Sequence, residues 1–149
     1  MNCLRCGKCC TQFGVCITPF DLLRLQEATG KPASAFVSLV VDRQERERKE
    51  PAILIDGSYW LLTLARDAKE VCCFYTGKGC SVYGDRPILC RCYPFVWRGK
   101  LKPLKSRACI AIWNPNEKEA KEYEQDAKQY AKEIRAYRII AKEWNKRGG

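Results

Sequence analysis

Histidine is absent from this 149-residue sequence, and methionine occurs only once. Without imidazole the chain cannot form mixed cysteine and histidine zinc sites, and it cannot use histidine as a general base. No run of roughly eighteen apolar residues is present, and the first residues lack the basic and apolar stretches of an export signal. We therefore expect a cytoplasmic protein with no membrane partner.

Cysteine is abundant, with eleven residues. The odd number and the missing export signal argue against a secreted disulfide scaffold and favour reduced thiols that bind metal. One group of thiols lies within the first ten residues and comprises Cys3, Cys6, Cys9 and Cys10. A second group begins roughly sixty residues later and comprises Cys72, Cys73, Cys80, Cys90, Cys92 and Cys109. We expect the intervening chain to fold back and bring the two groups together.

The spacing of the first group favours iron over zinc. Structural zinc sites usually take two separate C-x2-C pairs, whereas a C-x2-C-x2-C triplet with a remote fourth ligand is the arrangement of bacterial ferredoxins. Cys3, Cys6 and Cys9 follow the triplet pattern in one compact loop. The spacing alone leaves Cys10, Cys90 and Cys109 as alternatives for the fourth ligand.

Positive charge exceeds negative charge, with 27 Lys and Arg against 17 Asp and Glu. Arg5, Lys8, Arg86 and Arg91 lie inside the cysteine motifs, where a cation favours thiolate over thiol. Much of the excess is therefore expected to balance thiolates. Arg86 and Arg91 either donate hydrogen bonds to sulfur or form ion pairs with Asp85 and its neighbours.

Turn and cap signals predict an α+β fold built from short helices and β-hairpins. A helix is expected from Thr18 to Gly30, and a second, shorter helix from Lys31 through about Val41. One hairpin is predicted for residues 52–64 around Asp56-Gly57-Ser58, and another for residues 95–104 around Arg98-Gly99. Pro87 is expected to begin a helical turn that presents Cys90, with Pro94 after it.

A long amphipathic helix is predicted at the C-terminal end. Asn114 is the expected N-cap, with Pro115 at the first helical position and Glu117 in capping-box position. Apolar residues recur at spacings of three and four: Ala120, Tyr123, Ala127, Tyr130, Ile134, Tyr137, Ala141 and Trp144. We expect a cysteine-cluster domain over residues 1–113 and a helix over residues 114–149 that packs on it or projects from it.

The cysteine pattern resembles a known family. The motif C-x2-C-x2-C-C at residues 3–10, Cys72-x-Phe74-Tyr75, and the run from Gly79 through Cys80, Arg86-Pro87, Cys90 and Tyr93-Pro94-Phe95 are similar to the CxxCxxCC family of zinc- or iron-chelating domains. The resemblance implies an eight-cysteine metal site, often containing iron and sulfur. The implied ligands are Cys3, Cys6, Cys9, Cys10, Cys72, Cys80, Cys90 and Cys109, with Cys16, Cys73 and Cys92 as additional thiols. The choice between Cys72 and Cys73 stays open.

Three functions compete. The first is a protein with a [4Fe-4S]-type cluster and a redox or metal-handling role. The second is a zinc-stabilised module that binds a protein or nucleic acid, the latter through Trp97 and the basic residues Arg98, Lys100, Lys102, Lys105 and Arg107. The third is a methyltransferase-related domain, because flagellin lysine methylases resemble this family in carrying the same cysteine domain. The chain has no glycine-rich cofactor loop that would support methyl transfer, and the sequence does not indicate an oligomeric state.

Overall fold

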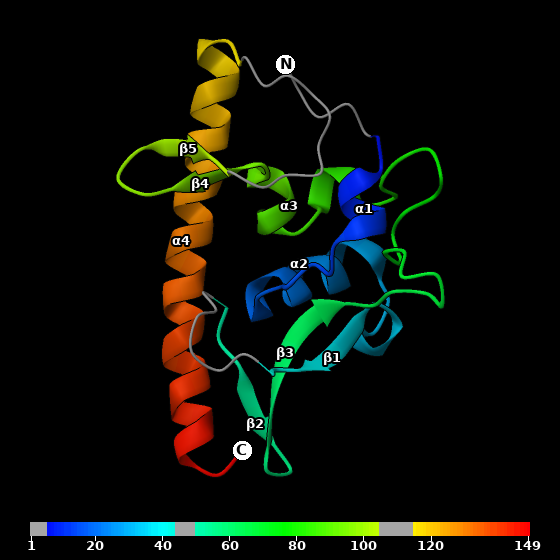
Figure 1. Ribbon diagram of the computed structural model, residues 1–149, viewed down its shortest axis with the longest axis vertical. Coiled ribbons are helices and arrows are strands. Elements are labelled where there is room, and N and C mark those ends of the chain that lie inside the picture. Colours follow the sequence, from blue (N-terminus) through cyan, green and yellow to red (C-terminus); the bar gives the residue numbers. More distant parts are fainter. Residues whose placement is uncertain (1–5, 44–49, 105–114) are drawn as a thin grey trace.

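The computed structural model describes residues 6–43, 50–104 and 115–149, and these residues form the predicted α+β fold (Figure 1). The helices are α1 (Lys8–Gln12), α2 (Pro19–Thr29), α3 (Ile88–Cys92) and α4 (Glu117–Lys146), with 3-10 turns η1 (Ala33–Ala35) and η2 (Tyr83–Asp85). The strands are β1 (Val37–Val41), β2 (Ile53–Ile55), β3 (Ser58–Leu64), β4 (Phe95–Trp97) and β5 (Leu101–Pro103). They form a three-stranded antiparallel sheet in the order β1-β3-β2 and a separate β4-β5 hairpin.

Helix α2 has the predicted ends. The Thr18 hydroxyl accepts a hydrogen bond from Asp21 N at 3.1 Å, and Thr18 N donates to Asp21 Oδ2 at 3.0 Å, which completes a capping box. Gly30 ends the helix in the left-handed conformation, with φ 66°. The buried residues Leu25, Ile17, Phe36, Leu64 and Phe74 then form a core between α2 and the sheet.

The first hairpin is also as predicted. Ile55 pairs with Ser58, so the connecting loop is Asp56-Gly57. Both loop residues have positive φ, 51° and 79°, which is the requirement of a type I′ turn. The β4-β5 hairpin likewise forms around Arg98-Gly99.

The second short helix predicted after Gly30 is wrong. Only the single turn η1 follows, and the chain then forms strand β1, which pairs with β3 from Val37 opposite Leu64 to Val41 opposite Trp60. The segment Val37-Ser38-Leu39-Val40-Val41 is rich in β-branched residues, which favour a pleated strand over a helix. Pairing with an apolar neighbouring strand therefore decided its conformation.

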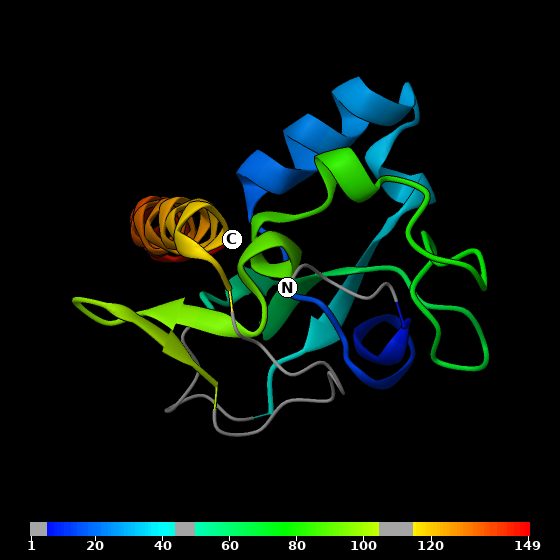
Figure 2. The ribbon, with the colours of Figure 1, turned by 90° about the horizontal axis from the view of Figure 1, so that it is seen from above.

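Helix α4 runs along the long axis of the molecule beside α3 and the β4-β5 hairpin (Figures 1 and 2). Its predicted apolar stripe is largely buried, at Tyr123, Ala127, Ile134, Tyr137 and Ala141. The predicted cap is wrong by two residues: Asn116 is the N-cap, and its side chain accepts from Glu119 N at 2.9 Å. Asn116-Glu117-Lys118-Glu119 offers the same capping-box pattern as the earlier candidate, and Asn114 itself lies outside the described residues.

The last turn of α4 is fixed to strand β2 by side chains. Trp144 Nε1 donates to Leu54 O at 2.8 Å, and Leu54 N donates to Asn145 Oδ1 at 2.8 Å. Asn145 Nδ2 also donates to Ala52 O at 3.1 Å. These bonds use backbone groups on the side of β2 that does not face β3. Within the described ranges, no helix combines the length and the apolar composition needed to cross a membrane.

Candidate metal centre

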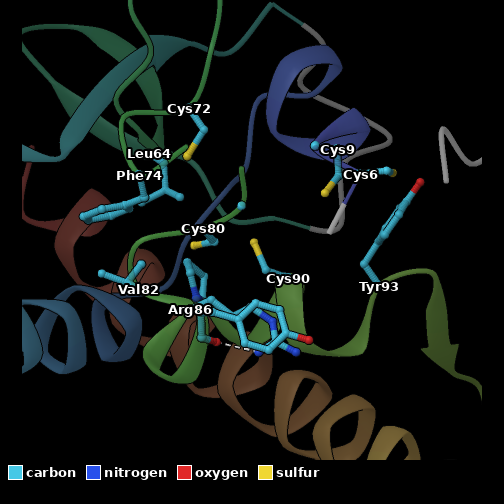
Figure 3. A pocket seen from close by; sticks show the side chains of 14 residues that line it. Cys6, Cys9, Leu64, Cys72, Phe74, Cys80, Val82, Arg86, Cys90 and Tyr93 are labelled. Carbon is cyan, nitrogen blue, oxygen red and sulfur yellow. Dashed lines mark hydrogen bonds between the residues drawn. The ribbon is translucent and has the colours of Figure 1, made fainter. Parts of the chain in front are cut away.

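Five cysteines from both halves of the sequence line a single cavity of about 70 Å³. Cys6 precedes α1 and Cys9 lies in it, Cys72 and Cys80 come from the loops after β3, and Cys90 comes from α3 (Figure 3). In Figure 3 the sulfur atoms of Cys9, Cys72, Cys80 and Cys90 point towards the space between them. The chain therefore does fold back and place the two thiol groups side by side.

Two contacts hold the halves together. Cys72 N donates a hydrogen bond to Cys10 O at 2.9 Å, which ties the second cysteine segment to α1. The Tyr75 ring lies directly over Gly7, so that a Cβ atom placed on Gly7 would be 2.6 Å from Tyr75 Cζ and 2.7 Å from Cε2. Because Gly7 also has φ 75°, both its backbone and its surroundings require glycine.

The described part of the first cysteine motif is partly helical, whereas the triplet predicts one compact loop; Cys3 lies outside the described residues. Lys8–Gln12 forms the short helix α1, and Gly7 is its N-cap in the left-handed conformation. The Thr11 hydroxyl donates to Gly7 O at 2.9 Å, and Thr11 N donates to the same oxygen at 3.0 Å. Cys9 and Cys10 are successive residues of this helix, and their Sγ atoms lie 4.0 Å apart in a hydrogen bond, although the two side chains have different surroundings. Cys9 lines the cavity, whereas Cys10 packs beside the apolar core.

The cavity walls are mostly apolar, with Leu64, Phe74 and Val82 beside the thiols. Among the described lining residues, Arg86 is the one cation, and there is no carboxylate. Arg86 Nη1 donates to Tyr83 O at 2.5 Å, and the guanidinium lies 4.0 Å from the centroid of the Tyr83 ring. Arg91 Nη2 donates to Gly84 O at 3.0 Å. Both arginines thus fix the turn η2, and Arg86 also places positive charge at the thiols.

The thiols differ in acidity. A hydrogen bond from the Cys10 thiol is the main cause that lowers the pKa of Cys9 to about 6, and the positive charge of Arg86 lowers it further. A hydrogen bond from the Cys73 thiol is likewise the main cause that lowers the pKa of Cys72 to about 7. The same hydrogen bonds raise the pKa of Cys10 and of Cys73, because each of these thiols serves as a donor to a thiolate. Burial raises the pKa of Cys80 and, more strongly, that of Cys90.

The remaining cysteines have other surroundings. Cys73 is exposed, does not line the cavity, and has its sulfur 3.9 Å from Phe36 O. Cys92 is buried with 1% of its surface exposed, and its thiol donates to Leu89 O at 3.5 Å. Cys16 is half-buried in a β-bridge opposite Thr63. Cys3 and Cys109, which the resemblance includes among the ligands, lie outside the described residues.

The donor set fits a soft metal or a metal-sulfur cluster. Thiolates are the ligands that zinc and iron-sulfur clusters share, and the described lining contains five cysteines and no carboxylate. Across residues 6–43, 50–104 and 115–149, however, no three acidic or thiol side chains lie close enough together to bind one ion. The thiols therefore surround a space instead of meeting at one point.

Comparisons with known proteins agree with the cysteine pattern. Searches of curated proteins and of solved structures find no match to this chain. The model of the CxxCxxCC family, described as "Putative zinc- or iron-chelating domain", matches residues 2–129 and so covers both cysteine groups and the cavity between them. The chain is a member of the CxxCxxCC family, and metal binding is the function that this membership supports.

Proposed function

We propose that the protein binds an iron-sulfur cluster of the [4Fe-4S] type in the thiol cavity and uses it in electron transfer or metal handling. The described candidates for ligands are Cys6, Cys9, Cys72, Cys80 and Cys90. Cys3, Cys10 and Cys109 complete the eight-thiol set that the family resemblance implies. The proposal depends on one observation, the arrangement of the thiols around a cavity.

The number of thiols and the size of the cavity favour a cluster over a single ion. A structural zinc ion takes four ligands, whereas five described thiols line this cavity. The cavity of about 70 Å³ is also several times larger than the roughly 10–15 Å³ that one water requires. A cluster, whose ligands bind different iron atoms, suits several thiols that line a cavity of this size.

The surroundings suit a redox centre. When bound, a cluster of this type supplies one-electron chemistry. The apolar side chains of Leu64, Phe74 and Val82 keep water away, and the Arg86 guanidinium offsets negative charge at the thiolates. Burial and nearby charge are two of the factors that set cluster potential. Reduced thiols also require a reducing compartment, which is why we place the protein in the cytoplasm.

The position of Cys72 gives the experiment a matched pair of variants. Cys72 lines the cavity, whereas the adjacent Cys73 does not. We expect anaerobically purified protein to contain iron and sulfide and to show broad visible absorption that bleaches on reduction. Cys72→Ser should lose most of this absorption, and Cys73→Ser should retain it. Stoichiometric zinc without visible absorption in the unsubstituted protein would contradict the proposal, and equal effects of the two substitutions would contradict the ligand assignment.

The zinc-stabilised binding module is the second candidate, and its proposed nucleic-acid surface is the β4-β5 hairpin. Arg98, Lys100 and Lys102 are exposed there, whereas Lys105 and Arg107 lie outside the described residues. Lys128 Nζ lies 4.4 Å from the centroid of the Trp97 ring, so that one face of this ring already has a partner from α4. Base stacking on Trp97 is therefore restricted to the other face. Binding to single-stranded RNA that weakens steeply with salt would favour this candidate.

A further inference from the structure

Asp21 is a buried carboxylate that serves two helices at once. It has 1% of its surface exposed, and its Oδ2 atom accepts hydrogen bonds from Thr18 N at 3.0 Å and from Thr18 Oγ1 at 3.2 Å. These bonds belong to the capping box of its own helix, α2. Its Oδ1 atom accepts a hydrogen bond at 2.9 Å from Ile88 N, the first residue of α3. The two oxygens of one side chain therefore join α2 and α3.

Helix α3 depends on this distant acceptor because its own sequence supplies none. Pro87 occupies the N-cap position of α3, and no side-chain cap is formed there. A proline side chain has no hydrogen-bond acceptor, so the Ile88 amide must find a partner elsewhere. Asp21, 67 positions away in sequence, is that partner. Helix α3 in turn carries Cys90, whose side chain lines the thiol cavity.

A second connection extends the network to α4. Arg24 Nη2 lies 2.5 Å from Asp21 Oδ1 and 3.1 Å from Glu133 Oε2, and Arg24 Nη1 donates to Glu133 Oε1. Glu133 is a buried residue of α4, with 5% of its surface exposed. Arg24 thereby neutralises two buried carboxylates, which would otherwise be costly to remove from water. The three charged side chains join α2, α3 and α4 in one hydrogen-bond network, in which both carboxylates are buried and Arg24 is partly exposed.

We propose that Asp21 is a positioning residue for the metal centre: by holding the first amide of α3, it fixes the helix that presents Cys90 to the cavity. This inference rests on the proposed function in taking Cys90 as a ligand. Groups that orient metal ligands from behind commonly change metal affinity by about 10–100-fold when they are removed. Asp21 acts through the backbone of α3 and does not line the cavity itself.

Thr18→Ala and Asp21→Ala form the matched pair that tests the proposal. Both substitutions break the capping box of α2, but only Asp21→Ala leaves the Ile88 amide without its acceptor. We expect Asp21→Ala to release iron to an excess of chelator about 10–100-fold faster than the unsubstituted protein, with Thr18→Ala within about threefold of it. Asp21→Asn keeps a carbonyl oxygen for Ile88 N, so we expect an intermediate rate. Equal release from Thr18→Ala and Asp21→Ala would overturn the proposal.

Amide hydrogen exchange on the reduced, metal-free proteins separates this proposal from the proposed function. We expect the Ile88 amide to exchange at least about tenfold faster in Asp21→Ala than in Thr18→Ala, since the first has lost the acceptor. Protein that contains no iron but shows this difference would contradict the cluster and leave the role of Asp21 in positioning α3 supported. Equal exchange of Ile88 in the two variants would overturn the positioning role whatever metal is found. If Asp21→Ala fails to fold, Asp21→Asn takes its place with a smaller expected effect: because an amide oxygen is a weaker acceptor than a carboxylate, Ile88 should still exchange faster in Asp21→Asn than in Thr18→Ala, and equal exchange would overturn the positioning role.

Discussion

Replacing Gly7 by alanine tests the contact that joins the two halves of the thiol site. Gly7 has φ 75°, and the left-handed conformation costs a residue with a side chain roughly 1–2 kcal/mol. The new Cβ atom would also lie 2.6 Å from Tyr75 Cζ and 2.7 Å from Cε2, so the ring has to move away from α1. Crowding of this kind typically costs about 1–3 kcal/mol. We expect Gly7→Ala to lower the free energy of unfolding by about 2–5 kcal/mol in total.

Gly77→Ala is the matched control for the backbone contribution. Gly77 has φ 84°, close to the value at Gly7, but no atom lies within 4 Å of the position that its Cβ would occupy. We therefore expect this variant to lose only the backbone cost of about 1–2 kcal/mol. The difference between the two variants isolates the collision with Tyr75. Substituting Tyr75 by serine in the Gly7→Ala background should recover much of this difference in a double-mutant cycle.

Urea unfolding followed by circular dichroism provides the measurement, with metal content and reductant held constant in all samples. An unchanged slope with urea would show that the variants differ in stability and not in the extent of unfolding. Equal losses for Gly7→Ala and Gly77→Ala would refute the reasoning, because the Tyr75 contact would then contribute nothing. The rate at which Gly7→Ala releases metal to a chelator should also rise, since Cys6 adjoins the substituted residue and Cys9 follows it by two positions.

Three further predictions concern pH, the cap of α4 and its last turn. Folding lowers the pKa of Cys9 to about 6 and that of Cys72 to about 7 from 9.0 in the unfolded chain. These two thiolates therefore stabilise the folded protein fully above pH 9.0, and their contribution is lost as the pH falls through 7 and 6. The raised pKa values of Cys80 and Cys90 contribute stability below pH 9.0 that is lost above it. The reduced, metal-free protein should thus be most stable near pH 9, and a maximum near pH 6 in urea titrations would contradict this. Asn116→Ala should lower the free energy of unfolding, measured by thermal unfolding, by about 1 kcal/mol, and Asn114→Ala should lower it much less. The reverse order would show that Asn114 is the N-cap of α4. Trp144→Phe should cost about 1 kcal/mol through loss of the bond to Leu54 O, whereas no change would show that this bond is dispensable.

Local signals in the sequence predicted those parts of the fold that short segments determine. Asp56-Gly57 specified its hairpin turn and Thr18-Pro19 the start of α2, since in both the required conformation depends on neighbouring residues. Strand β1 was missed because its conformation depends on pairing with β3, far along the chain. The start of α4 was misplaced because two capping-box patterns overlap there.

The candidate metal centre could also be predicted from the sequence only in part. The spacing of Cys6 and Cys9 and the second group at Cys72 predicted that the thiols would converge, and they line one cavity. Spacing could not separate Cys72 from Cys73, because the choice depends on which side of the loop faces the cavity. In the sequence, Asp21 is only an acidic residue in the first turn of an expected helix, where the helix dipole favours negative charge. Its bond to Ile88 crosses 67 positions, so only the folded arrangement discloses it.

The bonds from Trp144 and Asn145 to β2 have a consequence for handling the protein. These two side chains bind the outward-facing N–H and C=O groups of Leu54 and the C=O group of Ala52. A neighbouring strand would otherwise bind these groups, so the edge of the sheet at β2 is blocked to other molecules. We expect truncation of the chain before Trp144 to expose these backbone groups to strand addition by other molecules and so to increase aggregation.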